Sequence, residues 1–192
     1  MRAVLLACSI LSMSLLCGCE TSTSVNQSTA NTNSTINANA AQTSPVTDAA
    51  STRNFVDTAA ADGMAEVELC HLAMQKANNQ DVKQFAEKMV ADHSKANAEL
   101  KQLASNKNIV LPAGLNAYQK ADKDRLSKLS GVEFDREYMS LMSSAHDKAV
   151  NLFQLESHHG TDTDIETWAT KILPTLREHQ TLAKNIAAKL GG

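Results

Sequence analysis

Apolar residues recur at three- and four-residue steps along most of residues 54–190, which is the spacing of one face of an α-helix. Four segments keep this pattern over lengths typical of long helices: residues 54–77, 81–105, 133–158 and 164–190. Helix-favouring Ala, Leu, Lys, Glu and Met dominate them, whereas Gly and Pro fall mainly at the breaks. Pro174 lies well inside the last segment, where we expect it to kink or bulge the helix. The pattern predicts an all-α domain with four long helices.

The connection between the second and third of these helices is unusually long. It includes a short helical stretch near residues 116–129, whereas neighbouring helices of a bundle are usually joined by about two to eight residues. A connection that travels the length of the bundle is typical of ferritin-like folds. We therefore predict a ferritin-like four-helix bundle with one long crossover, occupying residues 53–192.

The N-terminus has the pattern of a signal peptide, with Arg2 before an apolar run at residues 3–17 that is too short to span a bilayer comfortably. The segment LCGC at residues 16–19 resembles the lipobox of bacterial lipoproteins. That resemblance implies removal of residues 1–18 by cleavage between Gly18 and Cys19, and attachment to a membrane through acyl chains on Cys19. Glu20 favours, by the same resemblance, the outer membrane facing the periplasm. The alternative is an ordinary secretory signal that is cut nearby.

Residues 19–52 consist almost entirely of Ser, Thr, Asn, Ala and Gln. Such a segment buries too little apolar surface to offset the entropy of ordering it, so we expect a disordered tether. About 30 residues of this kind span on the order of 30 Å. The folded domain would then stand off the membrane.

Charge and cysteine content narrow the function classes. The formal net charge is −3, and removal of Arg2 with the signal would make it more negative, so no basic footprint for nucleic acid is present. Of the four cysteines, Cys8 and Cys17 would leave with the signal and Cys19 would carry lipid. Cys70 is left without an intramolecular partner. Since it lies in an apolar helical pattern, we expect it to be buried.

Several stretches resemble one known family: residues 55–73, FAEKMVADH at 85–93, LSGVEFDREYM at 129–139 and LPTLREH at 173–179. They are similar to the ferritin-like bacterial envelope proteins called domain of unknown function 4142. The resemblance covers nearly all of residues 54–190. It implies the fold and the compartment, and it implies no activity, because the activity of the family is unassigned.

The candidate chemistry lies in the helix seams. Glu66, His93 and His179 interrupt apolar stripes, and His146 lies beside one. At 1.5 Å per residue each is roughly 20 Å from the nearest turn between long helices, so the four should meet at mid-bundle. We predict a metal site formed by Glu66, His93, His146 and His179, with Asp62 as a further candidate carboxylate. These ligands suit zinc, iron or copper.

The alternative is a buried polar network that only sets the register of the helices, in a structural lipoprotein whose outer face binds an envelope protein or a cell-wall component. A di-iron ferroxidase is disfavoured, because it needs Glu-x-x-His pairs on two helices and the one such pair, Glu156 and His159, lies at a turn. We expect Met89 and Met142 to serve packing rather than copper binding. No catalytic residue is assigned, and a non-enzymatic function is favoured.

Overall fold

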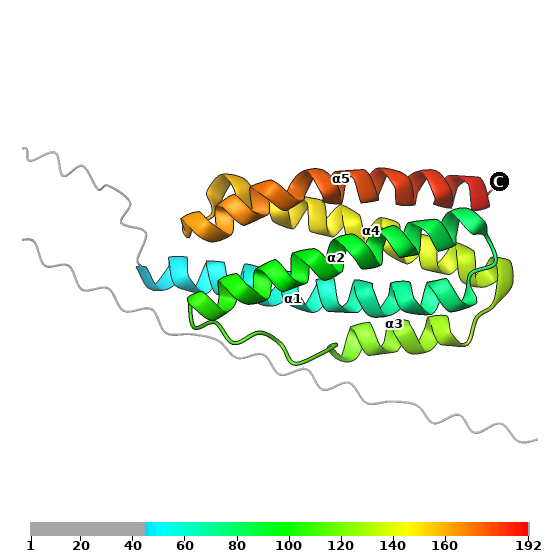
Figure 1. The fold of residues 1–192 in the computed structure, drawn as a ribbon, viewed down its shortest axis with the longest axis horizontal. Helices are drawn as coiled ribbons and strands as arrows, with labels where there is room; N and C mark the ends of the chain where they lie inside the picture. Colours follow the sequence, from blue (N-terminus) through cyan, green and yellow to red (C-terminus); the bar gives the residue numbers. More distant parts are fainter. Residues whose placement is uncertain (1–44, 192) are drawn as a thin grey trace, which may run out of the picture. The chain divides into compact units, whose positions relative to one another are not determined.

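The structure is a computed structural model in which residues 45–191 are described (Figure 1). The predicted signal peptide (residues 1–18), its cleavage after Gly18, the lipidation of Cys19 and the tether up to residue 44 lie outside the described residues. The described part folds into helices without a strand: α1 (Pro45–Lys76), α2 (Gln80–Asn106), α3 (Ala117–Ser127), α4 (Gly131–His159) and α5 (Thr163–Gly191). The prediction of an all-α domain is confirmed.

Four long helices lie side by side, and the short α3 runs beside them (Figure 1). The most extensive packing joins α4 to α5 and α1 to α2, with α2 on α5 and α1 on α4 completing the ring. The connection at residues 107–130 carries α3 and returns the chain from one end of the bundle to the other (Figure 1). As a result, each long helix sends one face toward a shared interior.

Helix α1 begins at Pro45, earlier than residue 54, where the hydrophobic pattern predicted it. Proline is well suited to the first helical position, because the N–H that it lacks would have no partner inside the helix there. Thr52 is already buried in this first part of α1. The predicted tether boundary at residue 52 is therefore wrong, since residues 45–52 belong to the helix.

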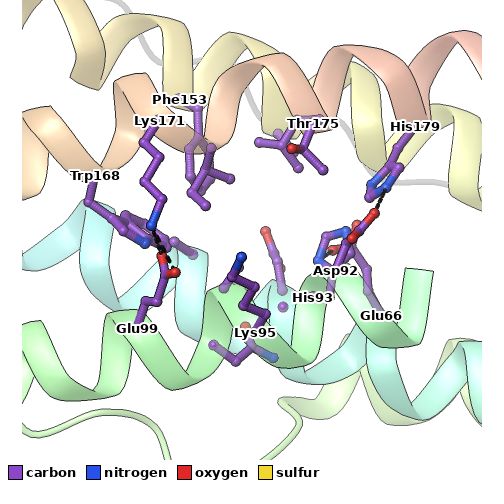
Figure 2. A pocket seen from close by; sticks show the side chains of 18 of the residues that line it. Glu66, Asp92, His93, Lys95, Glu99, Phe153, Trp168, Lys171, Thr175 and His179 are labelled. Carbon is purple, nitrogen blue, oxygen red and sulfur yellow. Dashed lines mark hydrogen bonds and ion pairs between the residues drawn. The ribbon is translucent and has the colours of Figure 1, made fainter. Parts of the chain in front are cut away.

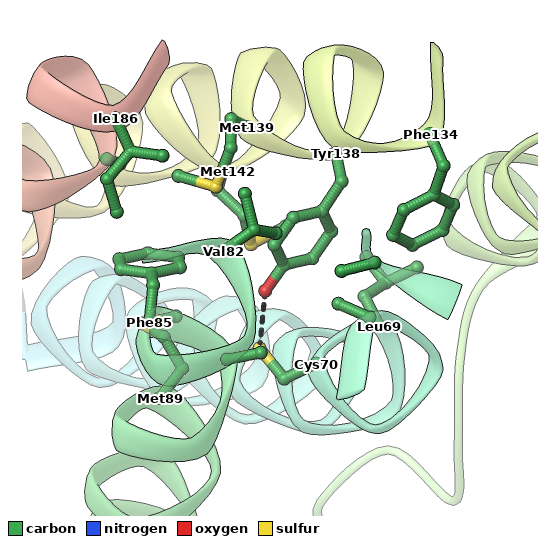
Figure 3. Close-up of a cluster of buried hydrophobic side chains, with 14 of the residues drawn as sticks. Leu69, Cys70, Val82, Phe85, Met89, Phe134, Tyr138, Met139, Met142 and Ile186 are labelled. Atoms are coloured by element: carbon green, nitrogen blue, oxygen red, sulfur yellow. Dashed lines mark hydrogen bonds between the residues drawn. The ribbon is translucent and has the colours of Figure 1, made fainter. Parts of the chain in front are cut away.

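Two apolar clusters fill the interior on either side of its middle. The cluster near the α1–α2 turn includes Phe85, Met89, Tyr138 and Met142, so both methionines have the packing role predicted for them (Figure 3). The other cluster includes Phe55, Leu100, Phe153 and Trp168. Among residues 45–191, no helix combines the length and the apolar character that crossing a membrane requires.

Cys70 is buried, as predicted, and its Sγ lies 3.2 Å from Tyr138 Oη (Figure 3). Burial raises the pKa of the Cys70 thiol to about 12. The thiol is therefore protonated at neutral pH and is a poor nucleophile and a poor metal ligand.

The α1–α2 turn is fixed from a third helix. Asp135 of α4, 1% exposed, accepts hydrogen bonds from the backbone N–H groups of Asn78 at 3.0 Å and Asn79 at 2.8 Å. The Asn79 side chain in turn caps α2 by accepting from the backbone N–H of Asp81 at 2.8 Å. These contacts set the register of α1 and α2 against α4, and so the height at which their inward side chains meet.

Helix α5 continues through Pro174 as one helix, and Pro174 is exposed. Pro174 lacks the N–H that would bond one turn back. Because it is exposed, water can reach the carbonyl left without that bond. Leu173 and Leu176 on either side remain buried, so the core face of α5 is preserved through this position.

Candidate metal centre

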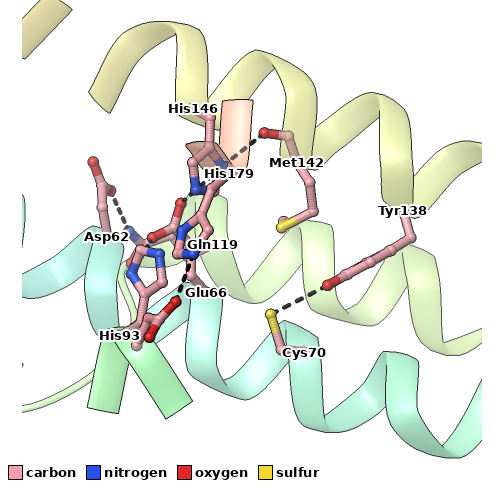
Figure 4. A network of polar contacts seen from close by, with 10 residues as sticks. Asp62, Glu66, Cys70, His93, Gln119, Tyr138, Met142, His146 and His179 are labelled. Atoms are coloured by element: carbon pink, nitrogen blue, oxygen red, sulfur yellow. Dashed lines mark hydrogen bonds and ion pairs between the residues drawn. The ribbon is translucent and has the colours of Figure 1, made fainter. Parts of the chain in front are cut away.

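Three histidines from three different helices meet in the middle of the bundle. His93 comes from α2, His146 from α4 and His179 from α5, and their exposed fractions are 6%, 0% and 0%. Their ring centroids lie 5.7 Å (His93–His146), 5.3 Å (His93–His179) and 5.5 Å (His146–His179) apart. One ligand atom from each lies within 4.8 Å of the other two (Figure 4). The convergence predicted from helix depth is present.

Each imidazole is held by an oxygen acceptor on one side of its ring. His93 Nδ1 lies 2.9 Å from Glu66 Oε2, His146 Nδ1 lies 3.0 Å from the carbonyl oxygen of Met142, and His179 Nε2 lies 2.9 Å from Asp92 Oδ2. Because carbonyl and ionised carboxylate oxygens only accept, the ring nitrogen that faces each of them carries the proton. These contacts therefore fix both the orientation and the tautomer of the rings.

The opposite ring nitrogens have no partner. His93 Nε2, His146 Nε2 and His179 Nδ1 are buried and make no hydrogen bond. Buried polar atoms are rarely left unpaired, since each costs about 1–3 kcal/mol. In the neutral ring such a nitrogen carries the lone pair that binds a metal. Three such nitrogens meeting in the interior are the kind of donor set that one transition-metal ion would need.

Electrostatics prepare two of the three rings for a metal. Burial lowers the pKa of His146, and it lowers the pKa of His179 to about 4 despite the hydrogen bond to Asp92. Both rings are therefore neutral at pH 7. Burial also opposes charge on His93, but the charge and hydrogen bond of Glu66 outweigh it and raise the pKa of His93. An ion binding at neutral pH would compete with a proton mainly at His93.

Glu66 lies at the cluster in the role of an acceptor. It is 5% exposed, and its Oε1 lies 3.7 Å from His146 Nδ1 in addition to the His93 contact. Burial alone would raise the pKa of Glu66, but the neighbouring histidines, His93 first, hold it below its usual value. Glu66 therefore stays ionised, with a negative charge beside the three rings.

Asp62, the further candidate, is not brought to the histidines. It is exposed and accepts a hydrogen bond from Gln119 Nε2 of α3 at 2.9 Å (Figure 4). His71, His158 and His159 are exposed as well, and they lie outside the group. The predicted set is thus reduced to three histidines, with Glu66 as their partner.

Asp92 contacts the histidine cluster, and the sequence reasoning missed it. Its Oδ2 also lies 3.1 Å from Lys88 Nζ, which reaches Glu178 at 3.2 Å. Burial alone would raise the pKa of Asp92, but its hydrogen bonds with His179 and Lys88 lower it. The sequence carried no signal for this role, because the residue directly before His93 falls on the polar side of the α2 pattern.

A cavity of about 150 Å³ adjoins the cluster. Figure 2 shows His179, Asp92, His93 and Glu66 at one end and Trp168, Lys171 and Glu99 at the other. Small side chains from α1, α2 and α4 leave this space open, namely Ala59, Gly63, Ala96 and Ala149. Exposed Lys95 and Lys171 are among the lining residues, so the cavity reaches solvent.

Comparison with known proteins identifies the family. Residues 35–186 match the family model described as "Domain of unknown function (DUF4142)", and the chain belongs to this family. The membership predicted from the sequence is confirmed. No curated protein matches the chain.

Two solved structures share the helical fold. The crystal structure of a DUF305 fragment from Deinococcus radiodurans is 14% identical, with a TM-score of 0.63, and the match covers 72% of this chain and 96% of that chain. CopM in the Cu(I)-bound form is 18% identical, with a TM-score of 0.63, covering 73% of this chain and 98% of that chain. At these identities the likeness shows the fold alone.

Proposed function

We propose that this domain binds one transition-metal ion through His93, His146 and His179. The observation that carries the proposal is the set of three buried ring nitrogens without partners, each on a ring whose other nitrogen is held by an oxygen acceptor. That pairing is the usual surrounding of metal-ligating histidines. Glu66 and Asp92 add two negative charges that balance a divalent ion.

Copper is the favoured ion, with zinc second and iron third. Imidazole nitrogen suits all three metals, and affinity for divalent ions peaks at copper. Iron sites in helical bundles draw mainly on carboxylates, whereas here the carboxylates contact the rings. The structural likeness to CopM, described in a Cu(I)-bound form, supports copper as the first choice.

A metal titration tests this function. The full chain, purified without added metal, is expected to bind one equivalent of copper. His146→Gln should weaken that binding more than 100-fold, because removal of a supporting residue alone costs about 10–100-fold. The exposed His71→Gln is the matched control and should bind like the wild type. Equal affinities for the wild type and His146→Gln would contradict the proposal, and circular dichroism verifies that the variant is folded.

A structural or interaction role is the second candidate. The contacts of the histidines with Glu66, Met142 and Asp92 would by themselves lock α1, α2, α4 and α5 in register. An envelope protein or a cell-wall component would then bind the outer face. The same titration separates the two functions, because a module that only fixes register binds no stoichiometric metal.

The proposed setting is the bacterial cell envelope, with a ferritin-like bundle tethered to the outer membrane and facing the periplasm. Support comes from the pattern of residues 1–20, where a signal-like apolar run ends in LCGC. Acyl chains on Cys19 would anchor the chain. A Cys19→Ser variant is expected to lose incorporation of labelled palmitate and to leave the membrane fraction. Unchanged labelling of that variant would rule out Cys19 as the lipidated residue.

A further inference from the structure

The cavity beside the histidine cluster reaches only one side of it. Glu66, Asp92, His93 and His179 contribute to its wall, whereas His146 does not. An ion held by the three histidines would therefore meet the cavity beside His93 and His179, while His146 lies outside the cavity wall. This asymmetry is what a coordination position open to solvent requires.

The number of protein ligands points the same way. Metal sites with four protein ligands are closed, whereas sites with three keep a position for water or an exogenous ligand. Within the described residues, the group that could hold an ion consists of the three histidines. Glu66 and Asp92 are outside this group, and each uses one oxygen to accept from a histidine ring. A fourth ligand would therefore come through the cavity.

The shape and charge of the cavity define what fits. About 150 Å³ holds several water molecules and excludes a bulky organic molecule. Phe153, Leu152 and Ile172 make the walls largely apolar. At the rim Lys95 is exposed, while Lys171 Nζ lies 2.8 Å from Glu99 Oε1. The lining also carries the carboxylates of Asp62, Glu66, Asp92 and Glu99, so its charge does not favour an anion. The small volume and the apolar walls limit the ligand to a small molecule.

Resting on the proposed metal function, we infer that the cavity delivers a small ligand of two or three heavy atoms to the open position of the histidine-bound ion. The bound ion would then be accessible to ligands from solvent, unlike an ion that is fully enclosed by protein ligands in a storage site. Ala96 of α2 lies in the cavity wall and is half-buried. A leucine there would fill the space without replacing a histidine or a carboxylate.

Azide titration of the Cu(II)-loaded full chain tests the inference. The wild type is expected to develop an azide-to-copper charge-transfer band, and Ala96→Leu should need at least tenfold more azide while keeping its copper. Thr175→Leu, which fills the cavity from α5, should behave in the same way. Ala98→Leu changes an exposed residue of the same helix, outside this cavity, and should match the wild type.

The outcomes separate the two proposals. A wild type that binds none of copper, zinc and iron would overturn the metal function itself. Bound copper whose spectrum azide leaves unchanged would overturn the open position alone, as would equal azide affinities for the wild type and the two cavity-filling variants. If one filled variant fails to fold, the other decides, since they add bulk from different helices.

Discussion

Glu66→Ala is expected to lower the free energy of unfolding of the metal-free protein by about 3 kcal/mol at neutral pH. The carboxylate is buried and accepts from His93 Nδ1 at 2.9 Å. Its removal leaves that N–H without its acceptor in a largely buried site and enlarges the neighbouring cavity. This loss of stability is at the lower end of the range for breaking a buried ion pair, because His93 can release its proton once the carboxylate is gone. Urea unfolding in the presence of a chelator measures the change.

Glu68→Ala is the matched control on the same helix. Glu68 pairs with Lys123 at 2.6 Å, but both side chains are more than 40% exposed, so its loss should cost under about 1 kcal/mol. Glu66→Gln keeps an oxygen that accepts from His93, so its loss of stability should lie between those of Glu66→Ala and Glu68→Ala. If Glu66→Ala costs no more than Glu68→Ala, the buried pair contributes nothing to stability.

The level of the three histidines along the bundle axis could be predicted, because an α-helix has a fixed rise per residue. His93, His146 and His179 each lie a similar number of residues from a turn, and a fixed rise per residue brings them to one level. The short turns after α1 and α4 make each pair antiparallel, so errors in the helix ends shift the level only slightly. Burial of His93 and His179 followed from their place in apolar seams, and that of His146 from its place beside one.

The partners of the rings could not be predicted in the same way. Asp92 points about 100° away from His93 around α2, so the hydrophobic period assigns it to the polar surface. Only the packing of α5 on α2 brings His179 to it. The acceptor for His146 is the backbone carbonyl of Met142. Since every residue has such a carbonyl, the residue type gives no sign of which one will accept.

Asp62 illustrates the opposite error. It lies one turn before Glu66, and sequence spacing alone places both on one face of α1. The position of α3 decides its environment, because Gln119 takes up the carboxylate at the surface. Because the connection at residues 107–130 is long, the sequence alone does not determine where α3 lies against the bundle. The cavity was equally hidden, since it forms only where small residues of several helices face one another.

Acidification is expected to destabilise the metal-free protein between about pH 6.5 and pH 4, chiefly through His179. Burial lowers the pKa of His179 in the folded chain to about 4, whereas an unfolded histidine titrates near 6.5. Over this interval the unfolded chain takes up a proton that the folded chain refuses, so stability falls as the pH falls. A difference of about 2.5 pKa units corresponds to a loss of about 3 kcal/mol.

The neighbouring groups of the cluster also titrate, and they act in both directions. Burial lowers the pKa of His146 as well, which adds to the loss. His93 acts in the opposite direction, because its raised pKa gives a contribution present below its unfolded pKa and lost as the pH rises through the folded value. The contribution of Glu66, whose pKa is lowered, is present above its unfolded pKa and disappears only as the pH falls through its folded value.

Urea unfolding of the wild type and of His179→Phe, each at about pH 7 and at about pH 4.5 with a chelator present, measures the effect. His179→Phe removes the titrating ring, so its stability should change less between the two pH values than that of the wild type, whatever its absolute stability. His71→Phe alters an exposed histidine, and its stability should change with pH as much as that of the wild type does. A wild-type slope in His179→Phe would assign the acid sensitivity elsewhere. Bound metal should make the free energy of unfolding depend more steeply on pH, because protons and the ion compete for the same ring nitrogens.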